Sequence, residues 1–143
     1  MAVVYLGLGS NLGNREDNLA RAVKELKNYA IEVESLSSII ESDPVGGPVQ
    51  GKFLNAVLKV NTGLLPIALL KACQSIEQRM GRIKTEINGP RLIDIDVLLY
   101  NRLQVKSPEL TIPHPRMLQR DFVMRPLKEI NPSLAKELES CAF

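Results

Sequence analysis

Four segments of this chain have apolar patterns that are typical of strands. The apolar run at residues 3–8 is typical of a buried strand, and a segment that starts at residue 31 alternates with period two towards residue 40. The same alternation returns over residues 53–60 and over residues 93–100. Because successive side chains of a strand point to opposite faces, each segment is expected to bury one face in a sheet.

Apolar residues spaced three and four apart predict two helices between these strands. Asn14 is placed to cap the first helix, whose apolar face would consist of Leu19, Ala22, Val23 and Leu26. The second helix would begin near Pro66 and end at Gly81, with an apolar stripe formed by Leu69, Cys73, Ile76 and Met80. Residues 42–52 are rich in proline and glycine, carry no period and are expected to form a loop.

The order strand–helix–strand–strand–helix–strand predicts an α+β fold of the ferredoxin-like βαββαβ type. In this arrangement an antiparallel four-stranded sheet carries both helices on one face, and the chain after residue 100 adds loop with short helical pieces. A length of 143 residues suits one domain, which is expected to span residues 1–143. Since this fold serves enzymes, RNA binders and regulatory modules alike, function must be inferred from the candidate site.

Composition favours an ordinary globular protein. The net charge is only +2, so the overall charge does not indicate a nucleic-acid or membrane partner. No apolar run is long enough to span a bilayer, and the N-terminus lacks the basic segment of a signal peptide. Cys73 and Cys141 have neither metal-ligand nor disulfide-framework spacing, so a reducing, cytoplasmic setting is expected. A protein partner is left open.

Two carboxylates alternate with aliphatic residues in the last predicted strand. Asp94 and Asp96 would emerge on one face of the strand, while Ile93, Ile95 and Val97 would point into the core. Two like charges side by side are costly unless a cation neutralises them, and Mg²⁺ commonly binds one or two carboxylates together with substrate phosphates. The alternative is a solvent-exposed strand face that happens to carry two acids.

The loop that leads into this strand is basic. Its cations are Arg82, Lys84 and Arg91. Arginine forks bind phosphate oxygens bidentately and lysine acts as a point charge, so this loop beside an acid pair predicts a polyphosphate site. The alternative is a solvated basic loop whose charges are satisfied by nearby acids such as Glu77 and Glu86.

His114, the only histidine, is held between two prolines in the segment 113–116. A single histidine without a cysteine partner does not predict a zinc site. In a polar loop it could donate a hydrogen bond to a phosphate oxygen, and the alternative is a surface histidine in a turn.

Two phosphate-binding signatures are excluded. The chain contains no G-x-x-x-x-G-K-[ST] segment. The glycines at 7, 9 and 13 do not match a dinucleotide fingerprint, because the spacing between the second and third glycine is one residue too long. We interpret that glycine stretch as a tight strand-to-helix turn in which Ser10 and Asn11 make backbone contacts.

Four segments, taken together, resemble one known family. They are GLGSNLG at 7–13, PVGGPVQGKFLNAV at 44–57, GPRLIDIDVLL at 89–99 and IPHPRMLQRDFVMRPL at 112–127. Their order and spacing, over essentially the whole chain, are similar to those of the 6-hydroxymethyl-7,8-dihydropterin pyrophosphokinases of the folate pathway. The resemblance implies a ferredoxin-like fold and transfer of a pyrophosphoryl group from ATP, the co-substrate, to the pterin hydroxymethyl oxygen, with release of AMP. It also implies two Mg²⁺ ions at the acid pair.

The resemblance implies a role for each matching residue. Catalysis would involve Arg82, Arg91, Asp94 and Asp96, of which the two aspartates would bind the metal. ATP would contact Arg82, Lys84, Arg91, His114, Arg116 and Arg120. The pterin would contact Ser42, Val45, Phe53, Asn55, Asp94 and Phe122.

The chemistry of the implied pterin residues agrees with a flat, conjugated ligand. Phe53 and Phe122 could sandwich its ring, and Asn55 could read its polar edge through an amide that both donates and accepts. Phe53 and Asn55 share one strand face because they are two residues apart. Either phenylalanine alone would be interpreted as a core aromatic.

The sequence departs from the family pattern before the Gly-Pro-Arg segment. Ile87 stands where a charged residue is usual, Asn88 stands where many members carry tryptophan, and the loop from Gly81 to Arg91 is one residue shorter than in some members. This loop and the loop at 42–52 are expected to act as lids that exclude water.

Two other function classes are compatible with the residues themselves. An RNA-binding or regulatory domain could share the predicted fold, although the aromatic strand of a typical RNA-binding sheet is absent from the sequence. Another metal-dependent phosphotransferase or nuclease could use the same acid pair on a different substrate.

Overall fold

The computed structural model describes residues 1–81 and 89–140. It has an α+β architecture built on one antiparallel sheet. In chain order the elements are β1 (Ala2–Ser10), α1 (Arg15–Lys27), β2 (Ile31–Leu36), β3 (Ile40–Ser42), β4 (Phe53–Thr62), α2 (Pro66–Arg79), β5 (Asp94–Tyr100), β6 (Val105–Lys106), β7 (Thr111–Ile112), a 3-10 helix η1 (Met117–Gln119), α3 (Asp121–Ile130) and α4 (Pro132–Glu139).

The main sheet has the strand order β2-β4-β1-β5, and the short strand β3 also pairs with β4. Every pairing in it is antiparallel. The prediction of an α+β protein with an antiparallel sheet is therefore confirmed. The prediction of one strand from residue 31 towards residue 40 is wrong, because the chain leaves the sheet after Leu36 and re-enters it at Ile40 as β3.

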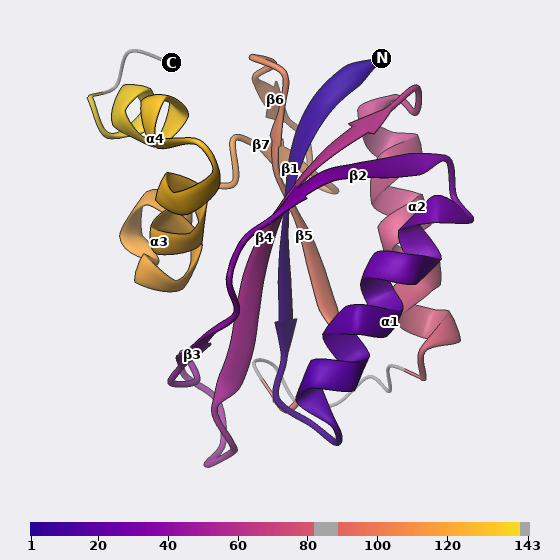
Figure 1. The fold of residues 1–143 in the computed structure, drawn as a ribbon, viewed down its shortest axis with the longest axis vertical. Coiled ribbons are helices and arrows are strands. Elements are labelled where there is room, and N and C mark those ends of the chain that lie inside the picture. Colours follow the sequence, from indigo (N-terminus) through magenta and orange to yellow (C-terminus); the bar gives the residue numbers. More distant parts are fainter. Residues whose placement is uncertain (82–88, 141–143) are drawn as a thin grey trace.

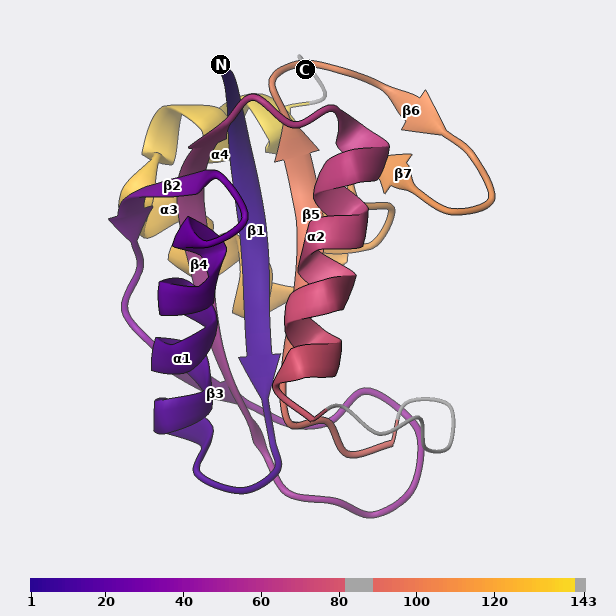
Figure 2. The same ribbon diagram turned by 90° about the vertical axis from the view of Figure 1, so that its right-hand side faces the viewer.

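Helices cover both faces of the sheet (Figures 1 and 2). Helices α1 and α2 lie on one face, and α3 and α4 lie on the other. Each face has its own apolar cluster: Leu26, Leu58 and Ile76 belong to the first, and Val57 and Leu127 to the second. The chain after residue 100, predicted as loop with short helical pieces, thus contains helices of ten and eight residues that complete a second core layer.

The helix starts agree with the local sequence signals. The Asn14 side chain accepts a hydrogen bond from the backbone N–H of Asp17 at the start of α1, and Pro66 is the first residue of α2. Cys73 is fully buried in the first cluster, as its place in the apolar stripe predicted. Gly81 follows the C-cap of α2 with a φ of +92°, a conformation that glycine adopts at little cost.

The first strand is longer than predicted. It extends from Ala2 to Ser10, so Gly7 and Gly9 lie inside the strand, and the interpretation of these two glycines as part of a tight turn is wrong. Of the three glycines in that stretch, only Gly13 has a positive φ, +71°. Within the part of the chain that the structure describes, no helix combines the length and apolar character needed to cross a bilayer.

Candidate active site

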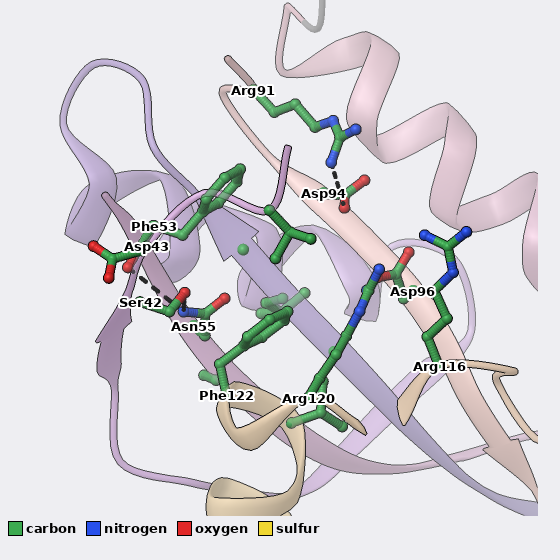
Figure 3. Close-up of a pocket in the computed structure, with 16 residues that line it drawn as sticks. Ser42, Asp43, Phe53, Asn55, Arg91, Asp94, Asp96, Arg116, Arg120 and Phe122 are labelled. Atoms are coloured by element: carbon green, nitrogen blue, oxygen red, sulfur yellow. Dashed lines mark hydrogen bonds and ion pairs between the residues drawn. The ribbon is translucent and has the colours of Figure 1, made fainter. Parts of the chain in front are cut away.

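One cavity gathers ten of the predicted site residues (Figure 3). They are Ser42, Val45, Phe53, Asn55, Arg91, Asp94, Asp96, Arg116, Arg120 and Phe122. The cavity lies between the ends of β1, β4 and β5, the segment that follows β3, and the start of α3. Figure 3 shows two chemical regions in it: aromatic and amide side chains gather at one end, and two carboxylates with three arginines gather at the other.

The acid pair occupies the position that period-two alternation predicted. Asp94 and Asp96 line the cavity, whereas Ile95 and Val97 are buried in the apolar cluster on the other side of β5. The carboxylate of Asp94 forms an ion pair with Arg91, at 3.4 Å between Oδ2 and Nη1. Both partners are partly buried, so solvent weakens this ion pair less than it would weaken one on the surface.

The surroundings of Asp96 disfavour the ionised form of its carboxyl. Burial, and next the nearby carboxylate of Asp94, raise the pKa of Asp96 to about 7, although the guanidinium of Arg120 opposes this change. A divalent cation would favour the ionised form, and carboxylate oxygens are the ligands that Mg²⁺ prefers.

The residues present fit Mg²⁺ held by two carboxylates. Among the described residues, no group of three or more histidine, cysteine, aspartate or glutamate side chains is placed to hold a metal. Two protein oxygens suffice for Mg²⁺, which keeps its remaining positions for water and phosphate.

A second cavity meets the first at Asp96. It is lined by Leu70, Ile95, Asp96, Val97, Ser107, Pro108, Glu109, Leu110, Thr111, His114 and Pro115. Its lining combines aliphatic side chains with polar groups, a mixture that suits a flat heteroaromatic ring with a polar edge. His114 lies here and not in the first cavity, and burial followed by the charge of Arg120 lowers the pKa of its imidazole.

Hydrogen bonds hold the amide end of the first cavity in place. Asn55 is buried in β4 and donates from Nδ2 to the Ser42 hydroxyl, at 2.7 Å, and more weakly to the carbonyl of Ile40. Phe122 lies on the other side of this end, and the guanidinium of Arg120 lies 5.5 Å from its ring centroid. Arg120 therefore contacts the aromatic end and also acts electrostatically on Asp96.

Gly7 and Gly9 form the floor of the cavity, a role that the sequence interpretation missed. Gly9 pairs with Asn55 on one side and with Asp94 on the other, and Gly7 pairs with Asp96. A Cβ on Gly9 would lie 3.5 Å from the Phe53 ring, in space that a ligand could otherwise use. The alternation of the two glycines with Leu6 and Leu8 was the available signal, because it places both glycines on one strand face.

Asn11 connects three chain segments beside the cavity. Its side-chain Nδ2 donates to Gln50 Oε1 at 2.7 Å and to the carbonyl of Gly51 at 3.0 Å. Its Oδ1 accepts from the backbone N–H of Arg91 at 2.7 Å, and its own N–H donates to the carbonyl of Arg91 at 3.0 Å. The predicted backbone contacts of Asn11 are thus confirmed, and they join the loop after β3 to the segment that carries Arg91.

Glu77 supports the acid-bearing strand from the helical side. Its carboxylate is buried in α2 and accepts the backbone N–H of Ile95, the residue between the two acids, at 2.8 Å. The sequence interpretation considered Glu77 only as a partner for the basic loop. An acid next to the apolar stripe of a helix was the signal that it is buried.

Six of the residues named above lie outside the described part of the chain. These are Arg82 and Lys84, predicted to contact ATP, Glu86, considered as a partner for the basic loop, Ile87 and Asn88, where the sequence departs from the family pattern, and Cys141. Their predicted roles stay predictions.

The cavity brings an acid pair, arginines and an aromatic subsite to one place, an arrangement typical of enzymes that handle phosphate. The sequence pattern of 7,8-dihydro-6-hydroxymethylpterin-pyrophosphokinase (HPPK) matches residues 5–132, and the chain belongs to that family.

Relatives of known name agree with this membership. The 2-amino-4-hydroxy-6-hydroxymethyldihydropteridine pyrophosphokinase of Bacillus subtilis is 44% identical over 139 residues, which are 96% of this chain and 83% of that protein. The Aquifex aeolicus protein of the same name is 44% identical over 134 residues, 94% of this chain and 83% of that protein. The folic acid synthesis protein fol1 of Schizosaccharomyces pombe is 45% identical over 133 residues, but these are only 18% of its length.

Solved structures show the same fold at low sequence identity. The wild-type HPPK-DHPS of Plasmodium falciparum with pterin and p-hydroxybenzoate has a TM-score of 0.69 at 16% identity, over 92% of this chain and 40% of that one.

Proposed function

We propose that this chain transfers a pyrophosphoryl group from ATP to 6-hydroxymethyl-7,8-dihydropterin and releases AMP, a step of folate biosynthesis. The observation that carries the proposal is one cavity in which an aromatic and amide end adjoins an acid and arginine end. The first end suits a flat pterin and the second suits a metal-bound polyphosphate. Membership of the HPPK family and the names of its relatives support the same reaction.

The pterin would occupy the end between Phe53 and Phe122. Its ring would lie between the two aromatic side chains, and its polar edge would meet the amide of Asn55. Because Asn55 already donates to Ser42, its Oδ1 is oriented and can accept from a pterin N–H. Val45, 59% exposed, would lose this exposure when the ring binds beneath its loop.

Asp94 and Asp96 would hold Mg²⁺, with two ions expected in the complex with ATP. When bound, Mg²⁺ supplies positive charge to the phosphate oxygens and so favours displacement at phosphorus. The protein's own contribution is to keep both carboxylates on one strand face, with Glu77 fixing the amide between them.

ATP would extend from the acid pair into the second cavity. Its adenine would pack against the aliphatic lining there, and its phosphates would reach the point where Asp96 borders both cavities. Arg91, Arg116 and Arg120 would neutralise phosphate charge, together with Arg82 and Lys84 from outside the described residues. His114 would contact ATP from the second cavity, and its lowered pKa indicates a neutral imidazole that can donate one hydrogen bond.

The residues would align the two substrates for an in-line displacement. A bond forms between the pterin hydroxymethyl oxygen and the β-phosphorus, and the bond from that phosphorus to the α,β-bridging oxygen breaks, so that AMP leaves. The hydroxyl proton passes to solvent or to a carboxylate of the cavity, such as Asp94. Since phosphoryl transfer depends mainly on positioning and electrostatics, the ring-binding walls would align the pterin, and the arginines and the acid pair would manage the charge of the phosphates.

We also propose that the core is of the ferredoxin-like βαββαβ type and forms a single domain over residues 1–143. The strand order β2-β4-β1-β5, with α1 and α2 on one face, supports this description. The strand β3, the β6–β7 hairpin and the helices α3 and α4 would be additions to that core.

The test is to incubate the protein with MgATP and 6-hydroxymethyl-7,8-dihydropterin and to identify the nucleotide product. We expect AMP in equal amount to the pterin diphosphate, and none without the pterin. Formation of ADP would indicate transfer of a single phosphoryl group and would contradict the proposal. The absence of nucleotide turnover would favour a binding module instead.

A further inference from the structure

Helix α3 contacts the far edge of the sheet through a carboxylate in its last turn. Glu129 Oε1 accepts the backbone N–H of Ser38 at 2.6 Å and the Ser38 hydroxyl at 2.8 Å, and Oε2 accepts the same N–H at 3.1 Å. Glu129 and Phe122 are seven residues apart in one helix, so they lie on the same helical face. The carboxylate and the ring that lines the cavity therefore belong to one side of α3.

The partner of this carboxylate is itself anchored to the sheet. Ser38 lies between β2 and β3, and the preceding residue, Ser37, is buried. Ser37 donates its N–H to the carbonyl of Val57 at 3.0 Å, and its hydroxyl accepts the Val57 N–H at 2.8 Å. The hydroxyl also donates to the carbonyl of Ser38 at 2.9 Å. Glu129 thus ties α3 to β4 through a short, fully hydrogen-bonded segment.

The two elements that Glu129 and Ser38 connect each carry residues that line the same cavity. On one side, α3 carries Phe122. On the other, β4 carries Phe53 and Asn55, and β3, which starts two residues after Ser38, ends at Ser42 beside Asn55. Figure 1 shows the segment between β2 and β3 passing along the side of the sheet that faces α3.

The position of Glu129 is not explained by helix stability. A negative charge in the last turn opposes the helix dipole, and apolar residues such as Val123 and Leu127 already bury α3 against the sheet. Apolar contact is not directional, whereas three hydrogen bonds to one carboxylate define the tilt and register of a helix.

We propose that Ser38 and Glu129 form a positioning pair that sets the separation of the Phe122 and Phe53 walls, and so the affinity for the pterin ring. This inference rests on the proposed function. The pair touches neither substrate, and it acts through the orientation of α3.

The test compares Glu129→Ala with Lys128→Ala by isothermal titration calorimetry. Lys128, the adjacent residue of α3, forms an exposed ion pair with Glu139 of α4 at 3.1 Å, on the side of the helix that meets α4. For Glu129→Ala we expect the Kd of 6-hydroxymethylpterin, measured with a saturating non-hydrolysable MgATP analogue, to rise by about fivefold to tenfold. The Kd of the analogue alone should stay within about twofold of the parent, and Lys128→Ala should leave both constants within that range.

Three further variants report on the pair itself. Ser38→Ala should give a smaller loss of pterin affinity, because the backbone N–H still donates to Glu129. The double variant Ser38→Ala/Glu129→Ala should bind no more weakly than Glu129→Ala, as expected for coupled partners. Glu129→Gln keeps one oxygen acceptor, and it should fall between the parent and Glu129→Ala; it serves as the test if Glu129→Ala does not fold.

Several outcomes would overturn the inference. One is unchanged pterin affinity in Glu129→Ala, or in Glu129→Gln if that variant is the one that folds. Equal losses for the pterin and the nucleotide analogue, or an equal pterin loss in Lys128→Ala, would show general destabilisation. A parent protein that binds no pterin would refute the proposed function as well, so the two failures are distinguishable.

Discussion

Asp96 lines the candidate site, and the raised pKa of its carboxyl has a consequence for the stability of the folded protein. Its carboxyl is placed against Asp94 and away from water, and its pKa of about 7 lies far above the value of 3.8 for an exposed aspartate. The folded protein therefore holds this proton more tightly than the unfolded chain does. From about pH 4 to about pH 7 the free energy of unfolding falls as pH rises, because ionisation is easier in the unfolded state.

Replacement of Asp96 by asparagine should raise stability and abolish activity. In metal-free buffer near pH 8, Asp96→Asn is expected to unfold at a higher temperature than the parent, and the difference should shrink towards about pH 4 as the parent carboxyl becomes protonated. Turnover should fall by at least about a hundredfold, because the proposed metal site would lose one of its two carboxylates. Thermal unfolding across pH and the AMP assay measure the two effects.

Glu16→Gln is a suitable control for that experiment, since Glu16 is an exposed acid in the first turn of α1. This variant should retain parental turnover and a parental pH profile of unfolding. A parental pH profile in Asp96→Asn would show that Asp96 is not the group that titrates near pH 7.

The walls of the cavity come from several helices, strands and loops, so their relative positions depend on bonds between these elements. Strand β1 forms the floor, the chain after β3 forms one side, and β5 brings the acids. Asn11 joins these parts. Its side chain bonds to residues 50–51 and to the backbone N–H of Arg91, and its own backbone N–H bonds to the carbonyl of Arg91. The position of Arg91, and hence its ion pair with Asp94, depends on this link.

Replacement of Asn11 by alanine should disturb both sides of the cavity at once. The partly buried backbone N–H of Arg91 would lose its side-chain acceptor, which costs up to about 1–3 kcal/mol, the range for a fully buried group. We expect kcat/KM to fall by about tenfold or more, since Arg91 and the loop after β3 would no longer be aligned. Steady-state kinetics with both substrates and thermal unfolding would measure the losses.

Asn61→Ala is the matched control, because the Asn61 side chain donates an exposed hydrogen bond to Glu34 at 3.1 Å. Its kinetics should equal those of the parent. If Asn11→Ala kept parental kcat/KM while losing stability, the link between the two segments would be structural alone.

At the scale of the whole molecule, a single sheet separates two apolar layers and places two cavities at one carboxylate. Helices α1 and α2 bury one face of β5, including Ile95 and Val97. Helix α3 and the segments beside it enclose the other face, where Asp94 and Asp96 point. A ligand that spans both cavities would therefore pass Asp96, which lines both of them.

Binding of MgATP should stabilise the whole domain, and removal of the metal should cancel most of that effect. With MgATP at about a hundred times its Kd, linkage adds about 2.7 kcal/mol, which for a chain of this size raises the Tm by several degrees. With ATP and excess EDTA the rise should fall to less than about half, because the acid pair then repels the triphosphate. Differential scanning calorimetry measures both shifts, and an equal rise with and without metal would contradict the metal role of the acid pair.

Features set by near neighbours in the chain were predictable. Asn14 and Pro66 identified the starts of α1 and α2, because capping depends on residues within one turn. Period-two alternation placed Asp94 and Asp96 on one face of β5 for the same local reason. Arg116 and Phe122 were assigned to the site by resemblance, and the structure brings both to the cavity.

Features that depend on contacts between distant segments were not predictable. The break between β2 and β3 exists because Ser37 bonds to Val57 and Ser38 bonds to Glu129, 91 positions further along the chain. The glycines of β1 were interpreted as a turn because glycine is common in turns. Their actual strand partners, Asn55 and Asp94, are far away in the sequence and could not be identified from it.

The order of the amino acids was enough to predict an acid pair, a set of arginines, two aromatic rings and an amide, together with the family to which these residues point. Only the packing of the chain shows which of them share a cavity, that His114 and Asp96 line a second one, and that Asn11, Glu77 and Glu129 bond to segments beside the site. The two kinds of feature differ in the sequence separation on which they depend. Side-chain chemistry and helix or strand period are local properties, whereas burial, pKa and the distance between cavity walls depend on packing between distant segments.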